Sequence, residues 1–222
     1  MDNDSKKLSF VRAKFGLRIY ESDNLNTERL SDLAEAGANL AGVLAPGDVA
    51  LVIGPSGSGK STLIRAFQEA SGALAATPIS GLAKRPPVCM IRRDLDSTLA
   101  TLARVGLGEA RRLVTPAGLL SDGERARLSL ARAIAHSRGR AAVRDVVCDE
   151  FTSSLDRLTA RSVCRCIRRA LAPGQRLVCA TAHDDVVRHL NPDVVVFVPL
   201  AGQPEFVKRE AGCGARTHSS VA

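Results

Sequence analysis

The sequence predicts an α/β protein with a mostly parallel sheet flanked by helices. Apolar runs of strand length alternate with stretches of helical periodicity along most of the 222 residues, and this alternation is typical of a sheet covered on both faces. Hydrophobic residues make up 45% of the chain, which is enough for a packed core. Aromatic residues make up only 3%, so that core must consist mainly of Ala, Leu and Val. The length suits one domain with a small subdomain.

The first half of the chain contains apolar runs of strand length and two stretches of helical periodicity. Residues 1–27 are polar and are expected to form an N-terminal extension. The elements expected, in order, are a short strand FGLRIY at 15–20, a helix over 28–44, a buried strand DVALVIG at 48–54, a helix over 60–70 and a short strand PPVCMI at 86–91.

The second half repeats the alternation. The elements expected are helices over 95–106 and 108–114, a helix beginning at Ser121, a strand RDVVCDE at 144–150, an Arg-rich helix over 155–171, a strand RLVCATAH at 176–183, a short helix DDVVRHL at 184–190 and a strand DVVVFV at 193–198. Residues 201–222 show no periodicity and are expected to form a flexible tail.

The charge is +8 and is concentrated between Lys84 and Arg144. Such a span can meet nucleic acid, an acidic partner or anionic lipid, or it can be a solubilising surface. The six cysteines form no C-x-x-C pair, which indicates reduced thiols. Neither a signal peptide nor an apolar run of membrane-spanning length is recognisable. The protein is therefore expected to be cytoplasmic.

The stretch GPSGSGKST fits the pattern G-x-x-x-x-G-K-[ST] between an expected strand and an expected helix. Backbone N–H groups of such a loop surround phosphate oxygens, the lysine reaches the β- and γ-phosphates, and the hydroxyl of Ser61 binds Mg²⁺. The expected nucleotide-binding residues are Gly54, Pro55, Ser56, Gly57, Ser58, Gly59, Lys60, Ser61 and Thr62.

Two carboxylates, Asp149 and Glu150, end the strand at 144–150. Asp149 would hold the Mg²⁺ shell, and Glu150 could act as the general base toward an attacking water. An acidic pair after a strand can also be a plain helix cap, so the neighbouring motifs decide between these roles.

The stretch LLSDGERARLSLARAIA, residues 119–135, begins a helix. Ser121 can serve as the N-cap, and Glu124 completes a capping box. Free N–H groups at such a helix start favour an anion. Because the chain already has one phosphate loop, this second anion site raises the question of whose phosphate it binds.

The phosphate loop, LSDGE, VVCDE, SSLD and TAH occur in the order found in ABC ATPases, and residues 48–198 resemble the nucleotide-binding domain of that family. LSDGE corresponds to the family signature LSGGQ, SSLD to the D-loop and TAH to the switch histidine. The resemblance implies a P-loop NTPase fold over residues 28–200, with a reduced helical subdomain at about 92–136.

The resemblance also implies a mechanism. In this family two subunits pack head to tail, so each ATP lies between one phosphate loop and the partner's signature. By resemblance, Ser121, Asp122, Gly123 and Glu124 would act on the ATP of the other protomer. His183 would position the γ-phosphate or the attacking water, and Asp156 would couple the two sites. The expectation is an ATPase with ATP and Mg²⁺ as ligands, working as an ATP-dependent homodimer.

Several positions depart from the family pattern. Asp122 and Glu124 replace Gly and Gln of the signature, and Asp122 adds a negative charge near a polyphosphate. Phe151 stands where Pro normally follows the catalytic Glu. RRDLD, 92–96, stands where a Gln is expected. The aromatics Tyr20 and Phe15 lie far from the loop for an adenine contact.

A narrower resemblance concerns the stretches VGLGEARRL, LSDGERARLSLA, DEFTSSLDRLTAR, ATAHDDV and NPDVVVFV. They look like soluble ABC-type ATPases that are fused to a GNAT-type acetyltransferase domain. Because no room for that domain is expected after the ATPase, either a separate acetyltransferase or another effector protein is the partner, or the chain is a cut-down relative of these proteins.

Three alternatives remain open beside the ATP-driven dimerisation switch. The chain could be the ATP-binding subunit of an ABC membrane transporter, although the segment between Lys60 and Ser121 is shorter than transporter subunits use. It could be a nucleic-acid-associated ABC ATPase, which the basic span permits but the low aromatic content does not support. A non-catalytic nucleotide module is the third alternative, and the presence of Glu150 and His183 argues against it.

Overall fold

The computed structural model describes residue 14 and residues 23–77, 83–91, 93–136, 145–153 and 155–209. Within these ranges a six-stranded sheet has the order β2-β3-β4-β1-β5-β6. The strands are β1 (Val49–Ile53), β2 (Leu74–Ala75), β3 (Val146–Cys148), β4 (Leu177–Thr181), β5 (Val194–Phe197) and β6 (Glu205–Lys208). All neighbours are parallel except β5 and β6. The α/β class with a mostly parallel sheet is confirmed.

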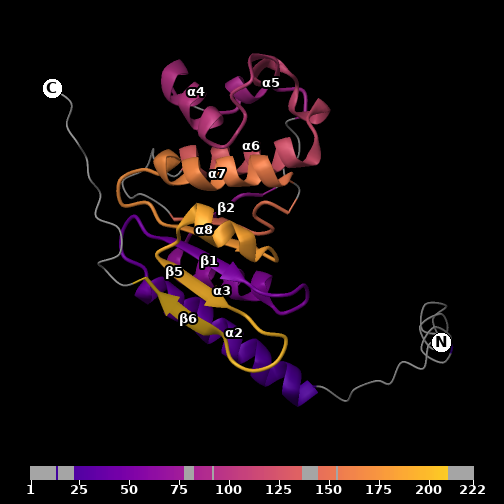
Figure 1. Cartoon of the computed structure of the whole chain (residues 1–222), viewed down its shortest axis with the longest axis vertical. Coiled ribbons are helices and arrows are strands. Elements are labelled where there is room, and N and C mark those ends of the chain that lie inside the picture. The colour runs from indigo at the N-terminus through magenta and orange to yellow at the C-terminus, as the bar shows by residue number, and fades with distance from the viewer. Residues whose placement is uncertain are drawn as a thin grey trace.

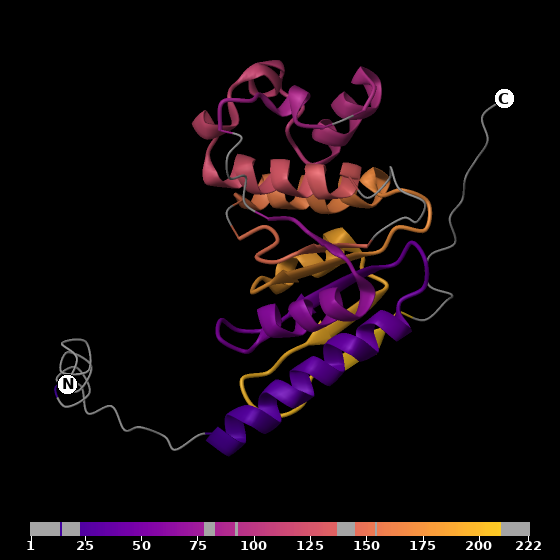
Figure 2. The same cartoon turned by 180° about the vertical axis from the view of Figure 1, so that it is seen from behind.

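Helices cover both faces of the sheet, as Figures 1 and 2 show from opposite sides. The helices are α2 (Asp23–Val43), α3 (Lys60–Ser71), α4 (Leu95–Arg104), α5 (Ala110–Val114), α6 (Asp122–His136), α7 (Arg157–Ala170) and α8 (Val187–Leu190). Three short 3-10 turns are η1 (Pro87–Cys89), η2 (Ala117–Leu119) and η3 (Asp184–Val186). Helices α2 and α3 lie on one face, and α6, α7 and α8 on the other.

The alternation of side chains along β1 divides the core between these two faces. Val49 and Leu51 pack in the cluster that includes Leu128 of α6 and Ile167 of α7. Ala50 and Val52 pack in the second cluster, which includes Leu33 and Leu40 of α2 and Leu63 and Phe67 of α3. Because both faces of β1 are buried, its sequence reads as one continuous apolar run.

The helical subdomain is small. Helices α4 and α5, with η1 and η2, lie beyond α6 and α7 at the end of the molecule away from the sheet (Figure 1). Asp94 of the RRDLD stretch caps α4, because its carboxylate accepts a hydrogen bond from the Ser97 N–H at 2.8 Å. Asp94 thus stabilises the start of α4 as its N-cap.

Three expectations about elements were wrong. Residues 87–89 form η1 rather than a strand, because Pro86 and Pro87 have no N–H to donate to a sheet. Part of the expected tail, residues 205–208, forms β6, which pairs with β5 and places Lys208 opposite Val194. Helix α2 begins at Asp23, ahead of its expected start at 28. The strand expected at 15–20 lies outside the described residues.

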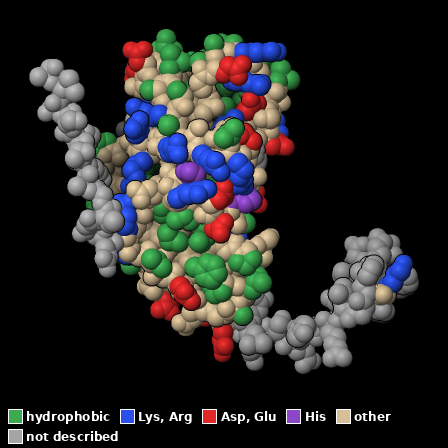
Figure 3. Space-filling model, in the orientation of Figure 1, with side chains coloured by type: hydrophobic (Ala, Val, Ile, Leu, Met, Phe, Trp, Pro, Cys, Tyr) green, Lys and Arg blue, Asp and Glu red, His purple; other side chains and the backbone are tan. Residues whose placement is uncertain are grey.

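Positive side chains gather across the face above α7 and α8 (Figure 3). Desolvation lowers the pKa of His189, and the charges of Arg165, Arg188 and Arg161 lower it further against the opposite effect of Asp185. None of the described helices has both the length and the apolar character needed to cross a membrane.

Asp193, the residue before β5, connects β1, α7 and the segment that follows β6. Its carboxylate accepts hydrogen bonds from the Val49 N–H at 2.9 Å, from Arg168 of α7 at 2.7 Å and from Arg209 at 2.5 Å. Burial alone would raise the pKa of Asp193, but the Val49 N–H and the two guanidinium groups lower it below the usual value.

We expect Asp193→Asn to lower the free energy of unfolding by about 1–3 kcal/mol at pH 7, because the buried Val49 N–H and two partly exposed guanidinium groups lose a charged acceptor. The folded-state pKa is below the unfolded one, so this stability is present above the unfolded pKa and is lost as pH falls through the folded pKa. Urea unfolding from pH 7 to pH 3 measures both effects. The exposed Asp96→Asn is the control; a difference between wild type and Asp193→Asn that does not shrink in acid would contradict the assignment.

Candidate functional site

The phosphate loop connects β1 to α3 and is shaped by its glycines. Gly57 has a φ of 80° and Gly59 a φ of 96°, in the left-handed region that disfavours side chains. A Cβ on Gly54 would lie 2.2 Å from the carbonyl oxygen of Val198, so only glycine fits at the start of the loop. These constraints explain why this segment turns sharply from a buried strand into a helix.

Lys60 lies at the first position of α3 and folds back over the loop. Its ammonium donates hydrogen bonds to the carbonyls of Gly54 at 2.8 Å and Pro55 at 2.7 Å. Burial lowers the pKa of Lys60, while the charges of Asp149 and Glu150 raise it. Both carboxylates line the same cavity as Lys60.

A cavity of about 310 Å³ is the place where these groups meet. It lies between the loop, the end of β3 and the end of β4, and it is lined by Ser56, Gly57, Gly59, Lys60, Ser61, Asp149, Glu150, Ser153, Thr181 and Ala182. The sequence-predicted phosphate loop and carboxylate pair, which lie far apart along the chain, thus form one site. His183 follows Ala182 but does not line this cavity; its N–H donates to the Thr181 hydroxyl at 3.2 Å.

The carboxylate pair has unusual backbone geometry. Glu150 has a φ of 51°, and Thr152 a φ of 69°, conformations that are costly for residues with a Cβ. The Glu150 N–H donates to the Asp149 carboxylate at 2.8 Å, and the Phe151 N–H donates to the Ala180 carbonyl at 2.7 Å. The strained turn therefore holds Asp149 and Glu150 at the carboxyl end of the sheet, where such folds bind ligands.

The side chains that line the 310 Å³ cavity fit a nucleotide with Mg²⁺. Magnesium is usually held by one or two carboxylates together with substrate phosphates, and Ser61 and Asp149 line the same cavity as Lys60. Among the residues that the structure describes, no group of three or more His, Cys, Asp or Glu side chains is arranged to hold a metal. A cation here would thus rely on phosphate oxygens for part of its coordination.

The expected capping box at the start of α6 is confirmed. The Ser121 N–H donates to the Glu124 carboxylate at 2.8 Å, and the Glu124 N–H donates to the Ser121 hydroxyl at 3.3 Å. Glu124 also forms an ion pair with Arg112 of α5 at 2.8 Å. Burial alone would raise the pKa of Glu124, but the bonds to Ser121 and the Arg112 charge lower it. Glu124 therefore ties the start of α6 to α5.

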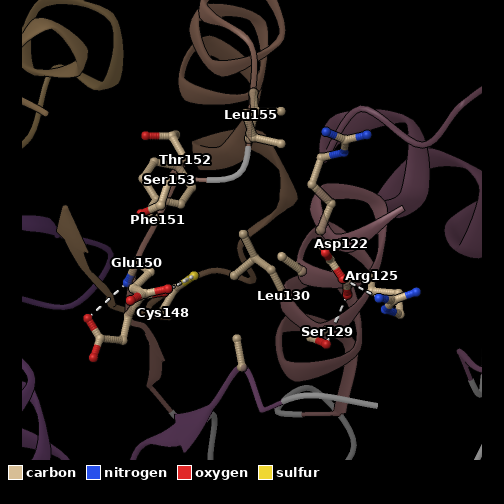
Figure 4. Close-up of a pocket in the computed structure, with 15 residues that line it drawn as sticks. Asp122, Arg125, Ser129, Leu130, Cys148, Glu150, Phe151, Thr152, Ser153 and Leu155 are labelled. Atoms are coloured by element: carbon tan, nitrogen blue, oxygen red, sulfur yellow. Dashed lines mark hydrogen bonds and ion pairs between the residues drawn. The ribbon is translucent and has the colours of Figure 1, made fainter. Parts of the chain in front are cut away.

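A second cavity, of about 460 Å³, lies between α6 and the carboxylate pair. Figure 4 shows Asp122, Arg125 and Ser129 on one side, and Cys148, Glu150 and Phe151 on the other. Asp122 forms an ion pair with Arg125. Ser121 and Gly123, both within the described residues, line neither cavity. Asp122, by contrast, lines the 460 Å³ cavity together with Asp149 and Glu150.

Asp156 is the N-cap of α7, and its carboxylate accepts hydrogen bonds from the N–H groups of Leu158 at 3.0 Å and Thr159 at 2.9 Å. The bonds from Thr159 hold the pKa of Asp156 below its usual value. Asp156 thus caps α7, a role that the SSLD motif alone does not predict.

Tyr20 and Phe15, the aromatics considered for an adenine contact, lie outside the described residues.

Comparisons with known proteins show which proteins the chain is similar to in sequence and in fold. No family model matches the chain. It is 31% identical to the cytochrome c biogenesis ATP-binding export protein CcmA of Chelativorans sp., over 72% of this chain and 89% of that protein. It is 49% identical over 65 residues to the ABC transporter ATP-binding protein RamA of Streptomyces coelicolor, covering 29% of this chain and 9% of RamA.

Among solved structures, the fold is similar to the ADP conformation of MJ1267, an ATP-binding cassette of an ABC transporter. The TM-score is 0.54 with 18% identity, over 74% of this chain and 81% of that one. The P-loop fold with its mostly parallel sheet is therefore shared. Together with the extended similarity to CcmA, this likeness shows that the chain belongs to the family of ABC ATP-binding proteins.

Proposed function

We propose that the chain is a Mg²⁺-dependent ATPase that works as an ATP-driven dimerisation switch. The observation that supports the ATPase is the 310 Å³ cavity in which Lys60, Ser61, Asp149 and Glu150 converge. The ABC family binds ATP, generally with Mg²⁺. Residues 28–200 would form the ATPase domain, with the helical insert at about 92–136.

Each residue has a role in the proposed reaction. The loop amides and Lys60 bind and orient the β- and γ-phosphates, and Ser61 and Asp149 would hold Mg²⁺, which neutralises charge on the phosphates. Glu150 accepts a proton from the attacking water. His183, next to the cavity, would hold the γ-phosphate or that water in line.

The dimer is proposed from the position of the signature. Free N–H groups at a helix start favour an anion, and Ser121 and Gly123 at the start of α6 do not line the cavity of their own phosphate loop. A second copy packed head to tail would bring its Ser121 and Gly123 to the γ-phosphate and complete the site, and Asp156 would couple the two sites. Phosphate release measured with Mg²⁺, and with EDTA in its place, tests the ATPase; no release above the EDTA control would contradict it.

The relatives' names favour a second candidate function, the ATP-binding subunit of a membrane transporter. CcmA is named an export protein, and RamA an ABC transporter ATP-binding protein. Co-purification of one stoichiometric polytopic membrane protein with the tagged chain from membranes would favour this function. A separate acetyltransferase or another effector protein is the partner that the soluble switch predicts, and stoichiometric co-purification of an acetyltransferase would favour it.

We expect no sequence-specific DNA binding from the basic span 84–144. The span contains no recognisable motif for reading base edges, and contacts of Arg with phosphates alone are independent of sequence and weaken with salt. Gel shifts on several duplexes at physiological salt measure this. A strong preference for one duplex would contradict the prediction and support a nucleic-acid-associated ATPase.

A further inference from the structure

Helix α2 supports the phosphate loop from behind. It packs lengthwise against α3, as Figures 1 and 2 both show. The two helices approach so closely at Gly37 that a Cβ there would lie 2.5 Å from the Leu63 carbonyl oxygen. Leu33 is only 2% exposed. A Cβ on Gly59 would lie 2.4 Å from the Cδ1 atom of Leu33, so this leucine fills the space beside Gly59. The loop and α2 are therefore in direct contact.

Arg29, one turn before Leu33, adds a polar connection. Its guanidinium donates hydrogen bonds to the carbonyl of Ser58 at 3.0 Å and to the carbonyl of Pro199 at 2.5 Å. It also donates to the carbonyl of Gly202. Three backbone carbonyls from two distant segments thus converge on one side chain. The planar, five-donor guanidinium suits this arrangement, whereas an ammonium group lacks that fixed fork.

The bond to Ser58 fixes the orientation of one peptide unit of the phosphate loop. In a planar trans peptide the C=O of one residue and the N–H of the next point in opposite directions. Holding the Ser58 carbonyl toward Arg29 therefore directs the Gly59 N–H away from α2. Gly59 lines the 310 Å³ cavity. Its φ is 96°, but a glycine can adopt negative φ about as readily, so without the bond to Arg29 this peptide could also take the opposite orientation.

We propose that Arg29 is a positioning residue for the phosphate loop, which presets the Gly59 amide for a phosphate oxygen and braces the loop against the β5–β6 connection. The proposal rests on the proposed nucleotide site. It assigns α2, whose start was expected to be part of a polar extension, to the nucleotide-binding apparatus. Arg29 would thus preorganise the loop: the Gly59 N–H is already oriented before the nucleotide binds, so no binding energy is used to orient it.

The experiment compares Arg29→Gln and Arg29→Lys with the wild type by titration calorimetry with MgATP and MgADP, and by steady-state ATPase kinetics. Arg29→Gln is expected to raise Kd and KM about tenfold, and to change kcat less than KM. Arg29→Lys keeps the charge but not the fork, so it is expected to stay weakened. Glu28→Gln, an exposed neighbour on α2, is the control and should bind as the wild type does.

Unchanged affinity in Arg29→Gln would overturn the proposal, and so would full recovery in Arg29→Lys, because charge alone would then suffice. A lower kcat with an unchanged KM would also contradict it. Thermal unfolding without nucleotide identifies a variant that has lost its fold; if Arg29→Gln has, Arg29→Lys alone decides the result. If the wild type itself binds no ATP, the proposed nucleotide site fails, and this inference fails with it.

Discussion

Lys60→Ala is expected to abolish measurable nucleotide binding. The Lys60 ammonium is the cation that lies over the loop, bonded to the carbonyls of Gly54 and Pro55. Asp149 and Glu150 lie near enough for their charges to act on it. Without the ammonium, phosphate oxygens would face these two carboxylates with no neutralising side chain from the loop, and like charges in a partly desolvated site repel strongly.

Titration calorimetry with MgATP measures the effect. Lys84→Ala, which removes an exposed lysine outside the cavity, is the matched control and should bind as the wild type does. The same affinity for Lys60→Ala and wild type would contradict the assignment of the phosphate loop as the nucleotide site.

Glu150→Gln is expected to retain ATP binding and to lose hydrolysis. Gln is nearly isosteric with Glu, so contacts of Lys60, Ser61 and Asp149 with the nucleotide are kept. An amide cannot take the proton of the attacking water, and the loss of a general base lowers kcat by roughly 10² or more. The φ of 51° at this position is unchanged in cost, because Gln meets the same steric limits.

Phosphate release and calorimetry on the same preparation separate catalysis from binding. Glu69→Gln, an exposed residue of α3, is the control for the substitution itself and should hydrolyse ATP at the wild-type rate. Hydrolysis by Glu150→Gln at the wild-type rate would exclude Glu150 as the general base.

The sequence was sufficient to predict the elements whose signals are local. The strand–loop–helix unit around Gly59 can be predicted from an apolar run, glycine spacing and the lysine, all within about 15 residues. The capping box of Ser121 and Glu124 spans a single helical turn and is present as expected. The same holds for the carboxylate pair, which a buried strand carries to the cavity.

Features that depend on distant contacts could not be predicted in this way. The bond from Arg29 to Pro199 joins residues 170 positions apart in sequence, and no periodicity identifies it. Strand β6, with the sequence EFVK, is exposed throughout and becomes a strand only through pairing with β5. The apolar run at 86–91 gave a strand signal, but two prolines removed the N–H groups that a strand needs.

We propose that Ser121 acts on the ATP of a second copy, a contact that the structure of one chain does not contain. A double variant, Glu150→Gln with Ser121→Arg, addresses it, because a bulky cation at the start of α6 would crowd the partner's γ-phosphate site. Ser121→Ala in the same background removes the cap hydroxyl without adding bulk, at a cost of about 1 kcal/mol, and so separates the stability of α6 from the interface.

Size-exclusion chromatography with light scattering, with and without MgATP, tests the composite site most directly. Trapped ATP that bridges two protomers stabilises the dimer by mass action, so Glu150→Gln should be a monomer without nucleotide and a dimer with ATP, and Ser121→Arg should restore the monomer. If Glu150→Gln stays monomeric while calorimetry shows ATP bound, the signature does not act on a partner's nucleotide, and the ATP-driven dimerisation switch is wrong.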